Sequence, residues 1–309
     1  MITPHPGVLR TPDERFAELP GFAFAPHYTD ALPGFEGLRM HYLDEGDPAA
    51  PVTFLCLHGQ PTWSYLYRRM LPVFVASGAR VVAPDLYGFG RSDKPVDESW
   101  YTFTRHRESL FAFVRHLGLQ HVTLACQDWG GILGLTLPMA DAARYERLIV
   151  MNTVLATGRY PLGEGFLAWR AWVNANPDFA VARLMRRSCP HLSDAEAAAY
   201  DAPFPTADHK AGARRFPNLV CDHPDADGAE TSRQAARWWQ HDWQGQSFMA
   251  IGMQDVVIPP AAMHRLRRAI RRCPPPLEIA DAGHFVQEHG EAVASAALAH
   301  FVTGSSEAS

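Results

Sequence analysis

The chain has 309 residues, of which 47% are hydrophobic and 20% charged, so it can bury one large α/β core that carries an insertion. Its formal net charge of −5 gives no indication of the concentrated basic face that proteins use to bind nucleic acids or anionic membranes. We therefore expect a globular enzyme that binds neither nucleic acid nor membrane and acts on small, uncharged molecules.

The five cysteines are scattered along the chain without CxxC spacing, which indicates neither a disulfide framework nor a zinc site. The first residues are polar and interrupted by prolines, a pattern unlike that of a signal peptide. No run of about 18 apolar residues is present, so the sequence predicts no membrane-spanning helix. We expect reduced thiols and a cytoplasmic protein.

Short apolar runs rich in β-branched residues are typical of buried strands. They lie at residues 52–57, 80–83, 122–125, 148–151, 248–252 and 277–279. Stretches with helical spacing stand between several of them, at residues 64–76, 104–117 and 261–270. This alternation predicts an α/β fold with a mostly parallel central sheet that is flanked by helices on both faces.

The alternation stops between about residues 152 and 240, where helical patterns dominate. A capping-box pattern, Ser193 to Glu196, precedes a run of alanines in this stretch. We expect residues 153–229 to form a helical cap domain. The main domain is expected to comprise residues 1–152 and 230–309.

Asp128 lies where a strand turns sharply into a helix. The strand at residues 122–125 leads directly into the sequence CQDWGG. In the G-x-S-x-G pattern, small residues two before and two after the nucleophile permit this turn, and Cys126 and Gly130 hold those positions here. Alone, the sequence also fits an ordinary turn with an aspartate helix cap. The residues at other strand ends favour a nucleophile.

Two of those residues complete a catalytic set. Asp255 follows the strand at residues 248–252, and His284 follows the last strand, which gives the order nucleophile, acid, histidine that is typical of α/β-hydrolases. Asn152 also follows a strand and is a weaker candidate for orienting the histidine, because it is neutral. The sequence therefore predicts that Asp128, His284 and Asp255 act together.

The turn after the first predicted strand, HGQPTW, can direct a main-chain N–H toward Asp128. We expect the main-chain N–H groups of Gln60 and Trp129 to form an oxyanion hole. His58 is expected to be structural, because it precedes the nucleophile and a histidine beside a tight glycine turn usually bonds the backbone.

Tryptophans indicate what kind of ligand the site holds. An indole N–H donates a hydrogen bond and cannot accept one, so two indoles converging in a dry pocket suit a halide ion. Trp129 follows the candidate nucleophile directly, and Trp169 and Trp172 fall in the predicted cap. Core packing is the expected role of the tryptophans at positions 63, 238, 239 and 243.

Nearly the whole chain resembles the haloalkane dehalogenases, specifically their first subfamily. The motifs that carry this resemblance are HGQPTWSYLYRRM, DLYGFGRSDKP, QDWGGILGLTLPMAD, FLAW, IGMQD and DAGHFVQE. The resemblance implies an α/β-hydrolase fold, halide binding by Trp129 and Trp169, and Asp255 rather than Asn152 as the acid. Another subfamily binds halide with an Asn side chain at the position of Gln60, so only the main-chain N–H of Gln60 is assigned a role.

The expected reaction starts with an anionic nucleophile, because a saturated carbon offers no carbonyl to polarise. Asp128 would displace the halide and form an alkyl-enzyme ester. Water activated by His284 would hydrolyse this ester to a primary alcohol, with halide and a proton as the other products. We expect no metal or organic cofactor, a haloalkane, water and halide as ligands, and a monomer or small homo-oligomer.

Two other functions remain open at this stage. An epoxide hydrolase of the same fold would need cap tyrosines as acidic donors, and Tyr160 and Tyr200 are the candidates. A non-catalytic ligand-binding protein could keep the fold and pocket without turnover.

Overall fold

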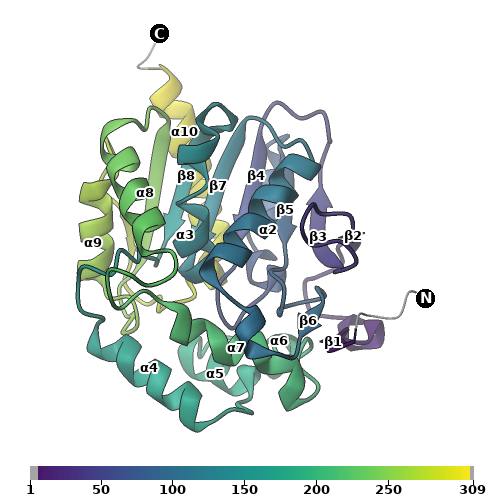
Figure 1. Ribbon diagram of the computed structural model, residues 1–309. Helices are drawn as coiled ribbons and strands as arrows, with labels where there is room; N and C mark the ends of the chain where they lie inside the picture. Colours follow the sequence, from purple (N-terminus) through teal and green to yellow (C-terminus); the bar gives the residue numbers. More distant parts are fainter. Residues whose placement is uncertain (1–5, 307–309) are drawn as a thin grey trace.

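A central sheet organises the molecule, and the computed structural model describes residues 6–306. Its strands are β2 (His27–Thr29), β3 (Met40–Glu45), β4 (Thr53–Leu57), β5 (Arg80–Pro84), β7 (Val122–Gln127), β8 (Tyr145–Met151), β9 (Gln246–Gly252) and β10 (Leu277–Ile279). Their order is β10-β9-β8-β7-β4-β5-β3-β2 (Figure 1). Pairing is parallel from β10 to β5 and antiparallel at β3 and β2, so the predicted mostly parallel sheet is confirmed.

All six strands expected from the sequence are present, whereas β2 and β3 were not expected. Both lie at one edge of the sheet and mix polar with apolar residues, as in the sequence MHYLDE of β3. A further pair, β1 (Val8–Leu9) and β6 (Lys94–Pro95), forms a separate two-stranded ribbon. Edge strands lack the continuous apolar run that marks a strand buried on both faces.

Helices cover both faces of the sheet (Figure 1). Their bounds are α1 (Leu71–Ala76), α2 (Phe103–His116), α3 (Asp128–Gly134), α4 (Glu164–Ala175), α5 (Val181–Ser188), α6 (Asp194–Ala199), α7 (Ala211–Arg215), α8 (Ala229–His241), α9 (Pro260–Ala269) and α10 (Gly290–Ser306). Short 3-10 turns include η2 (Ser64–Tyr67), η7 (Phe216–Leu219) and η8 (Val286–His289). One apolar cluster contains side chains of α2, α3, α8 and α9, and the other contains side chains of α1 and α10.

The alternation of side chains along β4 divides its residues between these two clusters. Leu55 and Leu57 belong to the first cluster, while Phe54 and Cys56 belong to the second. Successive side chains of a strand point to opposite faces, so a strand that is apolar at every position needs cover on both sides. This explains the continuous apolar run that predicted the strand.

The helix expected at residues 64–76 is wrong in one respect, because the stretch is divided into η2 and α1. Pro72 falls in the first turn of α1. Proline has no N–H to donate and its ring clashes with the preceding turn, so it is tolerated where a helix begins and disfavoured inside one. The other two expected helices correspond to α2 and α9, shifted by one residue.

Helices α4 to α7 lie together across one end of the sheet (Figure 1). The capping box predicted at Ser193 and Glu196 is confirmed at the start of α6, with both of its hydrogen bonds present. A buried network joins α6 to η2 and η8: Arg68 bonds both carboxylate oxygens of Glu288 at 2.8 Å and lies 3.2 Å from Glu196. Tyr200, which follows α6, also donates to Glu288.

The register of the parallel strands brings their carboxyl ends to one level. Leu57 at the end of β4 pairs with Cys126 of β7, and Gln127 pairs with Met151 at the end of β8. Gly252 at the end of β9 pairs with Ile279 at the end of β10. The segments that follow these strands therefore meet at one edge of the sheet, where open α/β sheets place their binding sites.

Some other properties concern the chain as a whole. All five cysteines are buried free thiols. Over residues 6–306, no helix combines the length and apolar character needed to cross a membrane. Within the same residues, no three His, Cys, Asp or Glu side chains gather in a way that would hold a metal ion.

A tight contact between α3 and β4 yields a test of the turn at Asp128. A Cβ atom on Gly130 would collide with the main-chain carbonyl of Leu57. Because a rigid backbone cannot yield, we expect Gly130→Ala to lower the free energy of unfolding by about 1–3 kcal/mol. Urea unfolding would measure this change.

Gly163 provides a matched control for this substitution. A Cβ atom there meets nothing within 4 Å, and its φ of −67° suits any residue. Gly163 is the N-cap residue of α4, so Gly163→Ala should lower the free energy of unfolding by less than about 1 kcal/mol. Similar values for the two variants would show that the contact with Leu57 does not constrain the turn.

Candidate active site

Asp128 occupies the turn between β7 and α3 in a left-handed conformation, with φ of 50°. This conformation is unfavourable for residues other than glycine and asks for compensating contacts. The main-chain N–H of Asp128 donates to the carbonyl of Asn152 at 3.0 Å, and the Asp128 carbonyl accepts from the Thr153 hydroxyl at 2.7 Å. The segment after β8 therefore holds the turn.

The Asp128 carboxylate lies between a main-chain donor and an imidazole. Its Oδ1 accepts from the Gln60 N–H at 2.7 Å, and its Oδ2 lies 3.5 Å from Nε2 of His284. The side chain keeps 13% of its exposure, so molecules of the size of water reach it. The main-chain N–H of Trp129 is the second expected oxyanion donor, and it makes no hydrogen bond to this carboxylate. It belongs to the first turn of α3, where main-chain N–H groups have no partner within the helix.

His284 follows β10 and contacts Asp255 through its other ring nitrogen. Nδ1 lies 2.7 Å from Oδ2 of Asp255. Burial alone would raise the pKa of Asp255, but the charge and hydrogen bond of His284, together with hydrogen bonds from the Ile258 main-chain N–H and the Asn152 side chain, outweigh it, so this pKa is lowered. The structure thus brings Asp128, His284 and Asp255 into one chain of contacts.

Asn152 does not touch the histidine. Its Nδ2 donates to Oδ2 of Asp255 at 2.7 Å, and its Oδ1 accepts from the Gly252 N–H at 2.8 Å. The residue that the sequence offered as an alternative orienting group therefore holds the carboxylate that contacts the histidine.

Gln127, which sequence reasoning did not assign a role, contacts His284 twice. Its Nε2 lies 3.1 Å from the His284 carbonyl and 3.0 Å from the imidazole Nε2. A carbonyl only accepts, so the nitrogen of this amide faces His284. When the imidazole is neutral, its Nε2 accepts from this amide and the remaining ring proton lies on Nδ1, toward Asp255. The sequence signal was a Gln at the end of an apolar run, directly before the candidate nucleophile.

Opposing effects set the protonation of His284. Burial lowers its pKa, but the carboxylates of Asp255 and Asp128 outweigh burial and raise the pKa to about 10. Removing the charge of either carboxylate would therefore lower this pKa.

The candidate halide ligands come from different parts of the fold. Trp129 is 2% exposed and meets the ring of Phe216 from η7 edge to face at 4.7 Å. Its indole N–H has no hydrogen-bond acceptor within the described part of the chain and is not fully enclosed. Trp169 lies on α4, where its indole N–H donates to the side-chain oxygen of Gln60 at 3.3 Å. Sequence reasoning assigned Phe216 no role at the site.

Two neighbouring aromatic residues support the ring of Trp169. Trp172 stacks on it with ring centres 5.5 Å apart, and Phe179 meets it edge to face at 5.8 Å. Trp172 is 42% exposed, which places it on the outside of α4. It is a packing neighbour of Trp169.

His58 bonds the main chain, as expected for a structural residue. Its Nε2 accepts from the Leu86 N–H at 3.0 Å, and its Nδ1 lies 2.9 Å from the Gly59 carbonyl. Complete burial lowers its pKa.

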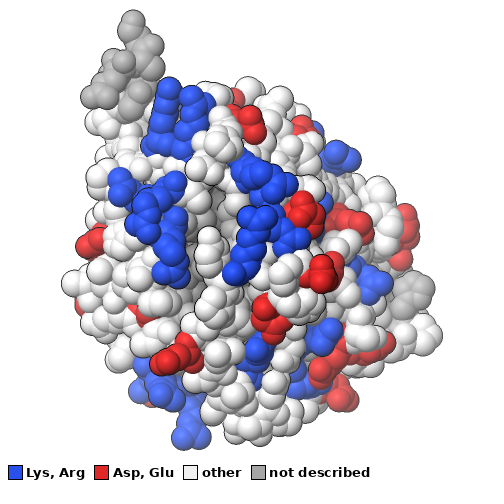
Figure 2. All heavy atoms as spheres, turned by 60° about the vertical axis from the view of Figure 1, so that its left-hand side comes forward, with Lys and Arg blue, Asp and Glu red and all other residues white. Residues whose placement is uncertain are grey.

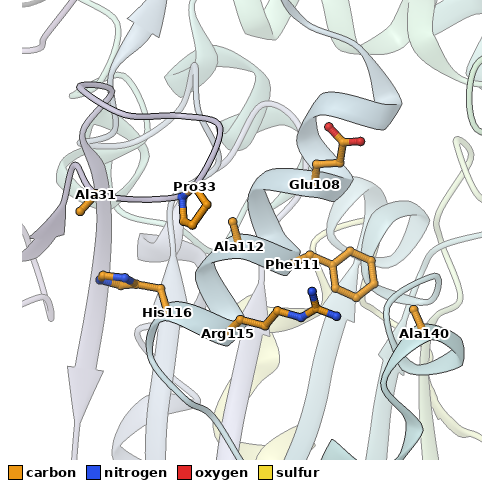
Figure 3. A pocket seen from close by; sticks show the side chains of 8 residues that line it. All are labelled: Ala31, Pro33, Glu108, Phe111, Ala112, Arg115, His116 and Ala140. Atoms are coloured by element: carbon orange, nitrogen blue, oxygen red, sulfur yellow. The ribbon is translucent and has the colours of Figure 1, made fainter.

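Other surface features lie apart from these residues. A groove of about 600 Å³ runs beside α2 (Figure 3). Its lining contains none of the candidate site residues and consists of Ala31, Pro33, Glu108, Phe111, Ala112, Arg115, His116 and Ala140.

Basic side chains gather on the face turned forward in Figure 2. On α9 and the following turn, Arg267 and Arg271 donate to main-chain carbonyls and so stabilise the fold itself.

Comparisons with known proteins agree on one family. A family model described as alpha/beta hydrolase fold matches residues 52–291. Haloalkane dehalogenase of Psychrobacter cryohalolentis is 42% identical over 294 residues, which cover 93% of this chain and 95% of that protein. Haloalkane dehalogenase 1 of Mycobacterium tuberculosis is 43% identical over 286 residues, covering 91% of this chain and 94% of that protein.

A solved structure is similar over the same length. The tetrameric structure of haloalkane dehalogenase DpaA from Paraglaciecola agarilytica NO2 matches with a TM-score of 0.93 at 50% sequence identity. The match covers 94% of this chain and 98% of that chain.

The contacts of Gln127 can be tested by its replacement with Leu. Gln127→Leu leaves the His284 carbonyl without its donor, and we expect the free energy of unfolding to fall by about 1–3 kcal/mol. Gln240→Leu, at an exposed position of α8, is the control and should change it by less than about 0.5 kcal/mol. Equal effects in urea unfolding would contradict a structural role for the two contacts.

Proposed function

The chain belongs to the haloalkane dehalogenases of the α/β-hydrolase fold, and from this premise we propose that Asp128 is its nucleophile. The protein is a hydrolase that cleaves carbon–halogen bonds. The chain of contacts from Asp128 through His284 to Asp255 is the observation that carries the assignment of residues. It joins an accessible carboxylate, an imidazole and a buried acid at the carboxyl ends of the strands.

In the first step an oxygen of Asp128 attacks the carbon that bears the halogen. The new C–O bond forms as the carbon–halogen bond breaks, and the halide leaves with the bonding electrons, so no proton is transferred. The indole N–H groups of Trp129 and Trp169 stabilise the charge that grows on the leaving halide. The indole N–H of Trp129, which has no hydrogen-bond acceptor among the described residues, supports this role.

In the second step water attacks the carbonyl carbon of the Asp128 ester. Nε2 of His284 takes the proton of this water, and Asp255 stabilises the imidazolium that results. The main-chain N–H of Gln60, which already lies 2.7 Å from the carboxylate, stabilises the oxyanion. The main-chain N–H of Trp129 is the second donor. As the tetrahedral intermediate collapses, His284 returns its proton to the departing alkoxide oxygen and the primary alcohol is released. The Asp128 carboxyl then loses a proton to solvent, which restores the carboxylate.

The alternative function as an epoxide hydrolase finds no support in the two candidate tyrosines. Tyr200 is fully buried, and its hydroxyl donates to Glu288 and accepts from Arg68, so its proton is already engaged. Tyr160 is 74% exposed on the surface. Neither hydroxyl is therefore placed to donate to an epoxide oxygen at the nucleophile.

We further propose that residues 153–229 form a cap domain over the site, with the main domain in residues 1–152 and 230–309. The start of α8 at Ala229 and the approach of Trp169 and Phe216 to the site support these boundaries.

A small homo-oligomer is favoured because the similar DpaA structure is tetrameric. The free buried thiols agree with a cytoplasmic location.

A halide-release assay tests the nucleophile. We expect the wild type to release bromide from bromoalkanes and Asp128→Ala to release none, because no other anionic group replaces the carboxylate. Asp281→Ala removes an exposed carboxylate three residues before His284 and should retain activity. Bromide release by Asp128→Ala at the wild-type rate would overturn the mechanism.

His284→Gln separates the two steps in the same assay. The variant should still form the ester and then stop, because loss of a general base slows its step by about 10²–10⁴. Mass spectrometry should detect the protein with one added alkyl group. An adduct that never accumulates, with steady release of alcohol, would exclude His284 as the base.

The pH dependence of ester hydrolysis follows from the charges around His284. Esterification neutralises Asp128, so the pKa of His284 is lower in the alkyl-enzyme than in the free protein. Only neutral imidazole accepts a proton, and the hydrolysis rate should therefore fall as the pH drops through this lower pKa. Single-turnover alcohol formation measured against pH would show the decline.

Asp255→Asn provides the comparison for this pH profile. It removes the second carboxylate that raises the pKa of His284, so the pH at which the hydrolysis rate declines, which we call the acid limb of the profile, should move to lower values. The maximal rate should also fall, because the imidazolium loses its counter-charge. An acid limb that stays in place would contradict the assignment.

A further inference from the structure

Gln60 makes three hydrogen bonds that connect separate parts of the fold. Its main-chain N–H donates to Asp128, as described above. Its side-chain Nε2 donates to the Ala213 carbonyl in α7 at 2.7 Å, and its Oε1 accepts from the Trp169 indole in α4 at 3.3 Å. The residue is 5% exposed. One side chain thus joins two helices across the sheet end, beside the candidate nucleophile.

The chemistry of its neighbours fixes the orientation of this amide. The Ala213 carbonyl can only accept a hydrogen bond, so it must face the amide nitrogen of Gln60. The Trp169 indole can only donate, so it must face the amide oxygen. A flipped amide would place oxygen against oxygen and N–H against N–H. The Gln60 oxygen is therefore the acceptor directed at Trp169.

An indole carries a single N–H, and a halide at Trp169 needs the hydrogen that Gln60 now accepts. We propose that the Gln60 side-chain oxygen is a resident competitor of the halide for the Trp169 N–H, and that it weakens halide binding and speeds halide release. This inference rests on the proposed role of Trp169 as a halide ligand.

The surroundings of Trp169 decide the direction of the effect. Trp172 and Phe179 hold the indole ring through aromatic contacts that do not involve Gln60. Removal of the Gln60 oxygen should therefore free the N–H while the ring stays in place. A halide then binds without breaking an existing hydrogen bond.

The same contact explains how the halide can leave a buried site. A donor left unpaired in the interior is unfavourable, and this cost would hold the anion in place. When the halide departs, the Gln60 oxygen recovers the N–H of Trp169. Gln60 is thus a positioning residue for the halide site, and Trp129, which has no such partner among the described residues, supplies the uncontested donor.

A double-mutant cycle on bromide binding tests the proposal. Gln60→Met keeps the length of the side chain and replaces the amide by a thioether, a weak acceptor. We expect the bromide dissociation constant, measured by quenching of tryptophan fluorescence at constant ionic strength, to fall about two- to tenfold. In a Trp169→Phe background, which lacks the contested N–H, the same substitution should change it by less than twofold.

Gln246→Met is a matched control. Gln246 accepts from Arg147 through its amide oxygen and donates to the Phe301 carbonyl through its nitrogen, but it begins β9 at the far end of that strand from the site. The bromide dissociation constant should stay at the wild-type value in this variant.

A nuclear magnetic resonance measurement on the wild type tests the proposal even if the Gln60→Met variant does not fold. The indole N–H resonance of Trp169, assigned by its absence in Trp169→Phe, should shift as bromide is added and follow the same dissociation constant. A resonance that does not move at saturating bromide would overturn the proposal.

The outcomes separate this inference from the proposed function. An unchanged or weaker bromide affinity in Gln60→Met, or an equal change in both backgrounds, overturns the inference while wild-type bromide release stands. If the wild type neither binds bromide nor releases it from bromoalkanes, the proposed function fails and the inference fails with it.

Discussion

The close approach of α3 to the end of β4 is the constraint on which the site depends. Gly130 lies so near the Leu57 carbonyl that no side chain fits between them, and this contact sets where α3 begins. Asp128 must then turn through a left-handed conformation, which directs its carboxylate toward Gln60 and His284. Packing between two backbones thus determines the position of the group that reacts.

The triad candidates could be found from the sequence because their signals are local. Asp128, Asp255 and His284 each follow an apolar run, and parallel strands bring such positions to one edge of a sheet. Gln127 and Asn152 were not assigned their contacts, because these depend on strand register and side-chain direction. The partners of Trp169 depend on how α4 and α7 fold back over the sheet, which no short motif reports.

The fold shows the same division between local and distant information. Strands buried on both faces produce apolar runs and were all predicted, whereas β2 and β3 at the edge carry polar residues and were missed. The division of the stretch at residues 64–76 depends on where Pro72 falls within a helical turn. Residue type alone indicated a helix there, and the position of the proline determined its start.

The buried network around Arg68 limits how a substrate enters. Arg68 and Glu288 lie in the main part of the fold, and α6 contributes Glu196 and the adjoining Tyr200. Moving α6 away would separate Arg68 from Glu196 and leave buried charges without a partner. Breaking a buried ion pair in this way is strongly unfavourable. Wholesale opening of the helical layer is therefore disfavoured. Haloalkanes and water must therefore reach Asp128 through small local motions of side chains and loops, and the amplitude of these motions limits the size of the molecules admitted.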